Sequence, residues 1–188
     1  MYAAVLDACV LVPNALCDTL LRMAEAGFFR PLWSDRILDE VRYAVMRIHT
    51  DIPEERIQRR LDAMNSAFDD ASVSGWQAVT AGLDLPDPDD RHVLAAAIAG
   101  GGQAIVTFNL KHFPDHALMP SGVEARHPDE FLLDQLDLRP SVALEVMQQQ
   151  AADMAHPPSD LAGLLSRLER CGVSGFVEAV RRLAPENA

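Results

Sequence analysis

Short apolar runs mark the expected strands of this chain. Tyr2–Leu6 is apolar and partly β-branched and ends at Asp7, which predicts a buried strand with an acid at its carboxyl end. Ala104–Phe108 has the same character and is followed by Asn109. Residues 123–125 predict a last short strand before the chain turns helical.

Apolar residues at helical spacing predict four helices between these strands. Their approximate ranges are 14–26, 35–48, 53–68 and 88–99. Asn14 and Ser34 are placed to cap the first two, and Gly27 is placed to end the first. Pro31–Trp33 lies between them and is expected to be a connection.

Beyond Arg139 the pattern is only helical. One helix is predicted before this boundary, at 128–136, and three follow it, at 142–155, 160–170 and 174–183. We therefore predict a domain of residues 1–138 and a small helical C-terminal extension of residues 139–188. Three short helices bury little surface alone, so we expect them to pack on the main domain or on a partner.

Strands that alternate with helices predict an α/β sandwich around a mainly parallel sheet. Ligands of such sheets bind beyond the carboxyl ends of the strands. Asp7 and Asn109 are both predicted at this edge. The fold class is therefore α/β with an added C-terminal helical segment.

Composition excludes several classes of protein. Hydrophobic residues make up 49% of the 188 residues, which is typical of a globular chain and not of a disordered one. The longest apolar stretches, such as Val93–Ile98, are too short to cross a membrane. We find no signal peptide and three widely spaced cysteines, so we expect a cytoplasmic protein in a reducing compartment.

The formal net charge of −12 lies mainly in the first part of the chain, where residues 1–137 hold 22 acids and 11 bases. Eight arginines fall between residues 22 and 60. Arginine makes forked contacts with phosphate, so the second and third helices could present an RNA-binding face. The candidates are Arg42, Arg47, Arg59 and Arg60. Solvated helix faces would explain the same residues.

Acidic and amide side chains form the candidate site. They are Asp7, Glu40, Asp87, Asp90 and Asn109. Each alone suits ordinary turn, surface or helix-capping chemistry. Together they are expected near one sheet edge, where converging carboxylates repel each other unless a cation joins them. Oxygen ligands suit Mg²⁺ or Mn²⁺, and such a site points to phosphoryl chemistry. The histidines and cysteines show no zinc-type spacing, and no P-loop is present.

Four segments resemble the four motifs of PIN domains, in the order of that family. They are Ala4–Leu11, Ser34–Val41, Asp87–Ala97 and Ile105–Pro114. The resemblance covers about residues 1–136, and among PIN proteins it is greatest to VapC-type toxins. It implies a PIN-like three-layer sandwich. It also implies a Mg²⁺- or Mn²⁺-dependent endoribonuclease that is the toxin of a type II toxin–antitoxin pair, with RNA as substrate, a cognate antitoxin as partner and a homodimer as the expected assembly.

The resemblance also implies roles for individual residues. Asp7, Glu40 and Asp90 match the metal-binding acids, with Asp87 as the rival to Asp90 in the same turn. Asn109 matches the fourth position, and Thr107 a supporting hydroxyl. Many relatives carry an aspartate where this chain has His112, so we expect one firmly held ion.

Two other functions share these features. One is a non-catalytic PIN-like module that binds RNA or protein. Such a module would be expected to lose the acids, whereas Asp7, Glu40 and Asp90 are all present. The other is a PIN nuclease of RNA processing, or a structure-specific DNA nuclease, which differs only in substrate.

Overall fold

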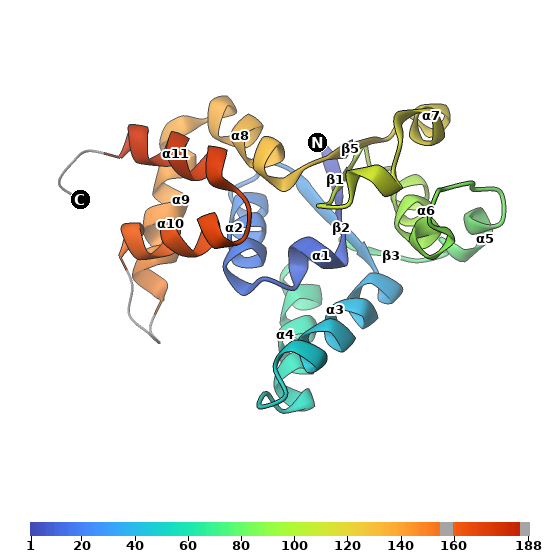
Figure 1. The fold of residues 1–188 in the computed structure, drawn as a ribbon, viewed down its shortest axis with the longest axis horizontal. Helices are drawn as coiled ribbons and strands as arrows, with labels where there is room; N and C mark the ends of the chain where they lie inside the picture. Colours follow the sequence, from blue (N-terminus) through green and yellow to red (C-terminus); the bar gives the residue numbers. More distant parts are fainter. Residues whose placement is uncertain (155–159, 185–188) are drawn as a thin grey trace. The chain divides into compact units, whose positions relative to one another are not determined.

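The computed structural model describes residues 1–154 and 160–184, which divide into two compact units. The first unit consists of Met1–Val12 and Phe29–Arg126, and the second of Pro13–Phe28 and His127–Ala188. The boundary that we predicted after residue 138 falls inside the second unit. Each unit is described by itself (Figure 1).

The first unit is built on a five-stranded parallel sheet in the order β3-β2-β1-β4-β5. The strands are β1 (Ala3–Leu6), β2 (Arg30–Ser34), β3 (Ser72–Val73), β4 (Ala104–Val106) and β5 (Glu124–Arg126). In the central register Val5 lies between Leu32 of β2 and Ile105 of β4. All residues of β1 are buried, as expected for a strand covered on both faces. The predicted α/β class is confirmed.

One strand was missed, because β2 occupies the segment that we expected to be a connection. Its second residue is Pro31, and a proline argues against a central strand since it cannot donate to the ladder. The register explains why it is tolerated here. Pairing of β2 with β3 begins only at Trp33, so Pro31 precedes that ladder.

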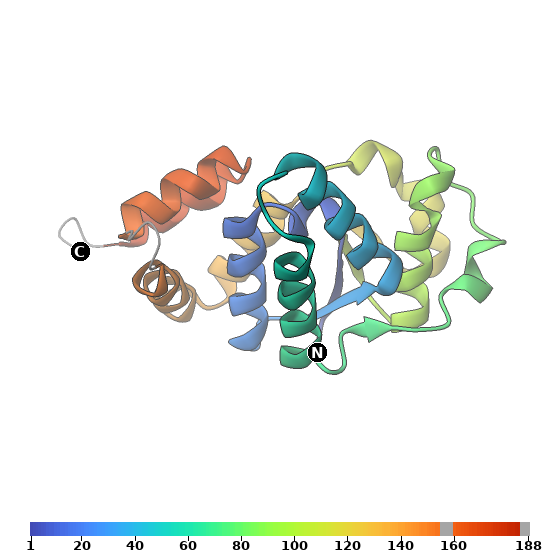
Figure 2. The same cartoon turned by 90° about the horizontal axis from the view of Figure 1, so that it is seen from below.

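Helices lie on both sides of the sheet, as α4 and α6 show (Figure 2). The helices of this unit are α1 (Ala8–Leu11), α3 (Asp35–Ile48), α4 (Glu54–Ala67), α5 (Gln77–Thr80), α6 (Arg91–Gly100) and α7 (Asp115–Leu118), with 3₁₀ turns at Pro88–Asp90, Leu110–His112 and Met119–Ser121. The Ser34 cap is confirmed, since its hydroxyl accepts a 3.2 Å bond from the Ile37 amide. Gly101, with φ of 65°, ends α6.

The strand order places a topological switch point between β1 and β4. The chain moves from β1 outward to β2 and β3, then returns to the other side of β1 with β4. Connections leave the carboxyl ends of β1 and β4 in opposite directions, which opens the crevice where α/β proteins bind ligands. Asp7 follows β1 and Thr107 follows β4, so both lie at this crevice.

The second unit is helical. It contains α2 (Asn14–Glu25), α8 (Pro128–Leu138), α9 (Pro140–Asp153), α10 (Leu161–Arg170) and α11 (Ser174–Leu183). The predicted Asn14 cap was wrong, because Pro13 is the N-cap of α2 and Asn14 is its first helical residue. We predicted that the helix after Pro140 runs to Ala155, which lies outside the described residues. None of the helices in residues 1–154 and 160–184 has the length and continuous apolar character that a bilayer crossing requires.

The C-terminal helices cover the early helix α2, which the sequence pattern did not predict. Helix α9 packs on α2, and α8, α10 and α11 complete the cluster. A buried polar contact fixes this pairing, because the Thr19 hydroxyl lies 2.8 Å from Gln150 Oε1 while the Gln150 amide donates to the Ala15 carbonyl at 3.1 Å. The apolar stripes of α10 and α11 are therefore largely buried within this unit.

Candidate metal centre at the carboxyl edge of the sheet

Asp7 is delivered to the switch point by β1 and held there by the backbone. Its amide donates to the Val106 carbonyl of β4 at 3.2 Å, and its carbonyl accepts the first bonds of α1 from Val10 and Leu11. Although Asp7 is the N-cap of α1, its side chain makes no capping bond. Asp7 is only 5% exposed, and its carboxylate is not used for helix capping.

Neighbouring hydroxyl and thiol groups orient the Asp7 carboxylate. Thr107, fully buried, donates to Asp7 Oδ2 at 2.6 Å and accepts the Asn109 amide at 3.0 Å. Cys9 donates to the same carboxylate oxygen at 3.0 Å. Burial raises the pKa of the Cys9 thiol to about 12, and the charge of Asp7 adds to the rise. Cys9 therefore stays a protonated donor at neutral pH and does not act as a nucleophile.

A second pair of acids lies at the start of α6. Asp87 caps the 3₁₀ turn, where its Oδ1 accepts the Asp89 amide at 3.0 Å. Asp90 is the N-cap of α6 but makes no side-chain capping bond. Its Oδ2 lies 2.6 Å from His112 Nδ1, and Asp87 Oδ2 lies 3.8 Å from the same nitrogen. One ligand atom from each of these three side chains lies within 4.8 Å of the others.

The electrostatics of Asp90 link the two groups. Burial raises the pKa of Asp90, and the nearby charges of Asp7 and Asp87 raise it further, while the hydrogen bond to His112 opposes the shift. Asp7 and Asp90 come from different elements, yet the charge of Asp7 is close enough to raise the pKa of Asp90. A cation would remove this repulsion.

Glu40 stands apart from the other acids. It lies on α3, where Oε1 is 3.2 Å from Arg36 Nε and 3.0 Å from His92 Nε2. His92 is 6% exposed, and neither ring nitrogen has a partner in hydrogen-bonding geometry. In the described part of the chain, Asp7, Glu40 and Asp90 do not form a set of ligand atoms within 4.8 Å. The structure therefore gathers Asp87, Asp90 and His112, with the charge of Asp7 near enough to raise the pKa of Asp90, and leaves Glu40 paired with Arg36.

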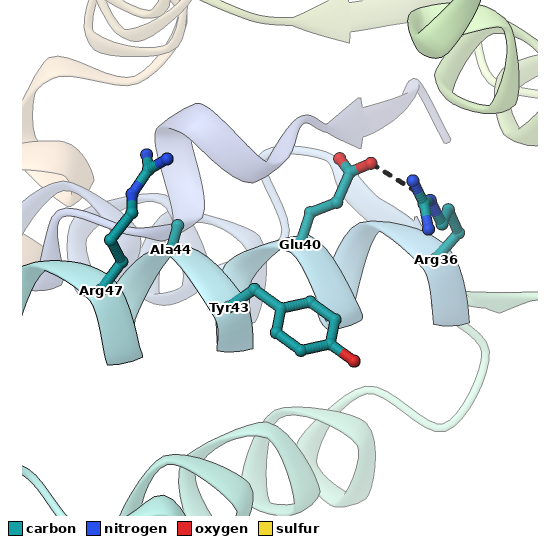
Figure 3. Close-up of a pocket in the computed structure, with 5 residues that line it drawn as sticks. All are labelled: Arg36, Glu40, Tyr43, Ala44 and Arg47. Carbon is teal, nitrogen blue, oxygen red and sulfur yellow. Dashed lines mark ion pairs between the residues drawn. The ribbon is translucent and has the colours of Figure 1, made fainter.

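An open pocket of about 260 Å³ runs along α3 beside Glu40. Its lining residues are Arg36, Glu40, Tyr43, Ala44 and Arg47. Figure 3 shows Glu40 and Arg47 pointing to the same side of the helix, whereas the Tyr43 ring lies on its near side and points away from them. Tyr43 is 60% exposed. The pocket thus joins a candidate metal ligand to arginine and an exposed aromatic ring.

The four arginines predicted to bind RNA have different surroundings. Arg42 forms ion pairs with Asp39 at 2.8 Å and Glu54 at 3.0 Å. Arg60 donates to the Leu11 carbonyl. The Arg47 and Arg59 guanidinium groups have no ion pair or hydrogen bond among the described residues and lie on exposed positions. Of the four, Arg47 and Arg59 are therefore the ones whose guanidinium groups are not already engaged with other described residues.

Three side chains near the acids were not included in the predicted site. Cys9 contacts the Asp7 carboxylate through its thiol. His92 and His112 contact Glu40 and Asp90 across 52 and 22 residues of sequence, respectively. For His112 a signal existed, since it replaces an aspartate of the resembling motif. For His92 we find none, because a histidine on an apolar helix has no spacing pattern that indicates a ligand or a carboxylate neighbour.

The donor set fits a divalent cation. Two carboxylates and one imidazole converge at Asp87, Asp90 and His112, and all three are only partly exposed. The Asp7 carboxylate is close enough to raise the pKa of Asp90. Oxygen-rich sets of this kind bind metal ions that activate water or neutralise phosphate charge.

Comparison with known proteins agrees with this geometry. The PIN domain family model matches residues 3–111, which is more than half of the chain. The chain belongs to the PIN-domain family. The model of the VapC50 C-terminal domain matches residues 128–182. The PIN match spans β1 to the 3₁₀ turn at Leu110–His112 and so includes every acid of the centre.

A curated relative carries the same name as the C-terminal match. It is the protein named "Putative ribonuclease VapC50" from Mycobacterium tuberculosis (strain ATCC 25618 / H37Rv), which is 46% identical over 99 residues. The alignment covers 53% of this chain and 58% of that protein, so the chain matches little more than half of the relative. No solved structure matches the chain significantly.

Proposed function

We propose that this PIN-domain protein is a metal-dependent endoribonuclease that hydrolyses RNA phosphodiester bonds, and that it is the toxin of a type II toxin–antitoxin pair. The observation that supports the enzymatic part is the grouping of Asp87, Asp90 and His112, where burial and the charges of Asp7 and Asp87 raise the pKa of Asp90. A centre of mutually repelling, partly buried acids costs stability, and a cation that it binds offsets that cost. The toxin role rests on the likeness to the relative named VapC50.

In this proposal Asp7, Asp90 and Glu40 hold the cation, with Asp87 beside them. When bound, the cation supplies an activated water and neutralises charge that develops on the scissile phosphate. Thr107 and Cys9 keep the Asp7 carboxylate in one orientation. Asn109 contributes to the same edge, since its backbone amide donates a hydrogen bond to the Thr107 hydroxyl. Glu40 joins the other ligands by turning away from Arg36, which a partly exposed glutamate with several rotatable bonds can do.

Substrate binding is assigned to the pocket on α3. Arg47 lines the pocket and has no ion pair or hydrogen bond with the residues that the structure describes, so its guanidinium suits a phosphate of the RNA backbone. Tyr43 is 60% exposed and has the Arg42 guanidinium over one ring face, 4.8 Å from the centroid, so we assign stacking of an unpaired base to the opposite face, an interaction worth about 1–3 kcal/mol per base. The pocket is lined by Glu40, a ligand in this proposal, which supports RNA contacts close to the centre.

The catalytic proposal is tested by replacing Asp7 with Asn and measuring cleavage of a labelled RNA in Mg²⁺ and in Mn²⁺. Cleavage should fall by at least about 100-fold, because a carboxylate ligand is lost. The start of α1 should be unaffected, since the Asp7 side chain makes no capping bond. The matched control is Asp62→Asn on α4, an exposed acid outside the centre. Wild-type cleavage that persists in excess EDTA contradicts metal dependence, and metal binding without any cleavage of diverse RNAs favours a non-catalytic module.

Arg47→Ala should weaken RNA binding. The slope of log affinity against log salt concentration should fall by the amount expected for about one phosphate contact. Both are measured by fluorescence anisotropy in the Asp7→Asn variant, which should not cleave the RNA. Tyr43→Ala should weaken binding about 5- to 100-fold, whereas Tyr43→Phe keeps the ring and should bind normally. Arg56→Ala on α4 is the control for loss of an exposed arginine. Equal affinities for the Tyr43→Ala and wild-type proteins would remove the stacking contact from the proposal.

The toxin proposal needs a separate measurement. Expression of the wild type should arrest growth of a host cell, and the Asp7→Asn variant should not. Co-expression of an antitoxin encoded beside the gene should relieve the arrest and form a complex with the chain. RNA cleavage without growth arrest favours a PIN nuclease of RNA processing.

A further inference from the structure

His112 brings a nitrogen ligand to a group of carboxylates. Its Nδ1 lies 2.6 Å from Asp90 Oδ2 and 3.8 Å from Asp87 Oδ2. Within residues 1–154 and 160–184, no other group of three or more histidine, cysteine or acidic ligand atoms is gathered within 4.8 Å. The side chains of His112, Asp90 and Asp87 are 26%, 21% and 42% exposed, so the three ligand groups are partly shielded from water.

We propose that His112 is itself a metal ligand, and that Asp87, Asp90 and His112 hold a divalent transition-metal ion of the Fe²⁺, Co²⁺ or Zn²⁺ class in preference to Mg²⁺. This inference rests on the proposed function, because Asp90 belongs to both ligand sets. It assigns a role to His112 that the predicted all-oxygen site did not contain.

The distances are close to those of a coordination sphere. Two ligand atoms that each lie about 2.1 Å from an ion, at an angle of about 90–110°, are about 3.0–3.4 Å apart. The contact of His112 with Asp90 must therefore open by a few tenths of an ångström, and that with Asp87 must close by a similar amount. Side-chain rotation alone supplies such movements. Asp87 Oδ1 remains on the Asp89 amide meanwhile, so Oδ2 is the oxygen that reaches the ion.

Imidazole changes which ion the acids prefer. Mg²⁺ is a hard cation that takes oxygen ligands and keeps several waters, so a ring nitrogen in place of an oxygen gains it little. Imidazole suits Fe²⁺, Co²⁺ and Zn²⁺, whose affinities for mixed nitrogen and oxygen sites exceed that of Mn²⁺. One nitrogen among carboxylates therefore tilts the selectivity of the centre toward these ions.

The test uses the full-length protein, with Co²⁺ as the transition-metal probe and Mg²⁺ as its competitor. In the wild type, Co²⁺ bound through His112 should give a paramagnetically shifted imidazole N–H resonance in the proton NMR spectrum. His112→Asp should abolish this resonance and lower the ratio of Co²⁺ to Mg²⁺ affinity by about tenfold or more, the size expected when one interaction at a metal site is lost. The control His116→Asp makes the same chemical change at an exposed histidine and should alter neither readout.

The possible results separate this inference from the proposed function. A Co²⁺ complex without a shifted histidine resonance, or an unchanged affinity ratio in His112→Asp, overturns the role of His112 while metal-dependent cleavage stands. Failure of the wild type to bind Co²⁺, Mn²⁺ or Mg²⁺ at all overturns both. Circular dichroism of the three proteins checks that a lost resonance does not come from unfolding.

Discussion

Replacing Thr107 by Val measures how firmly the fold prepares Asp7 for its role. Thr107 is fully buried, and its hydroxyl serves two neighbours at once: it donates to Asp7 Oδ2 at 2.6 Å and accepts the Asn109 amide at 3.0 Å. Valine has nearly the same shape but lacks the hydroxyl. The substitution therefore deprives a buried carboxylate of its shortest hydrogen bond and leaves an amide without its acceptor.

The cost follows from these two losses. A hydrogen bond to a charged group contributes about 1.5–3 kcal/mol, and a neutral one about 1 kcal/mol. The Cys9 thiol keeps its bond to Asp7 and limits the loss. We expect Thr107→Val to lower the free energy of unfolding by about 2–4 kcal/mol. Thr107→Ser keeps the hydroxyl and removes one methyl group, which should cost only about 1 kcal/mol.

Urea denaturation in EDTA, followed by tryptophan fluorescence, provides the measurement. Trp33 and Trp76, the two tryptophans of the chain, lie in the first unit, so the signal reports that unit alone. On an Asp7→Asn background the effect of Thr107→Val should shrink to about 1 kcal/mol, because the acceptor has become neutral. If Thr107→Val costs no more than Thr107→Ser, the hydroxyl does not hold the carboxylate, and Thr107 would contact water or substrate instead.

Two further predictions concern Asp90 and the second unit. The pKa of Asp90 is raised chiefly by burial, so its charged form destabilises the fold above that pKa and the penalty fades as the pH falls through it. Asp90→Asn should therefore stabilise the protein at pH 7 in EDTA, with a gain that shrinks on acidification in pH-dependent unfolding curves; a gain that grows on acidification contradicts the sign. Truncation after Leu138 removes α9 to α11 and exposes α2, so the shortened chain should lose helical content and aggregate; an equally stable and soluble product shows that α2 needs no cover.

Local sequence signals predicted the elements that carry the first acids. The apolar run before Asp7 indicated β1, and the run before Thr107 indicated β4, because a strand buried on both faces needs no alternation. Parallel pairing then required their carboxyl ends to share an edge. For this reason the sequence predicted Asp7 and Asn109 at one edge without any knowledge of register, whereas the contact of Asp7 with Thr107 is a finding of the structure.

Contacts that depend on register or on long-range packing could not be predicted. Pro31 argued against β2, and only the late start of its pairing with β3 makes the proline compatible with a central strand. An apolar stripe shows that a helix face is covered but does not name the cover, so the pairing of α9 with α2 was missed. The same limit applies to Glu40, whose neighbour His92 comes from a different helix.

The acids of the centre differ in how far the fold has prepared them to bind a cation. Asp7 Oδ2 already accepts hydrogen bonds from two side chains, and the Asp7 backbone amide at the end of β1 donates to a carbonyl of β4. The Asp90 side chain is hydrogen-bonded to His112, which on our inference changes from a hydrogen-bond partner into a metal ligand. Glu40 is the least prepared, since an ion pair with Arg36 must break before it can join. Arg36 is then released from this ion pair and becomes available to a phosphate in the same pocket. Metal binding and substrate binding are therefore expected to favour each other through the exchange of one ion pair.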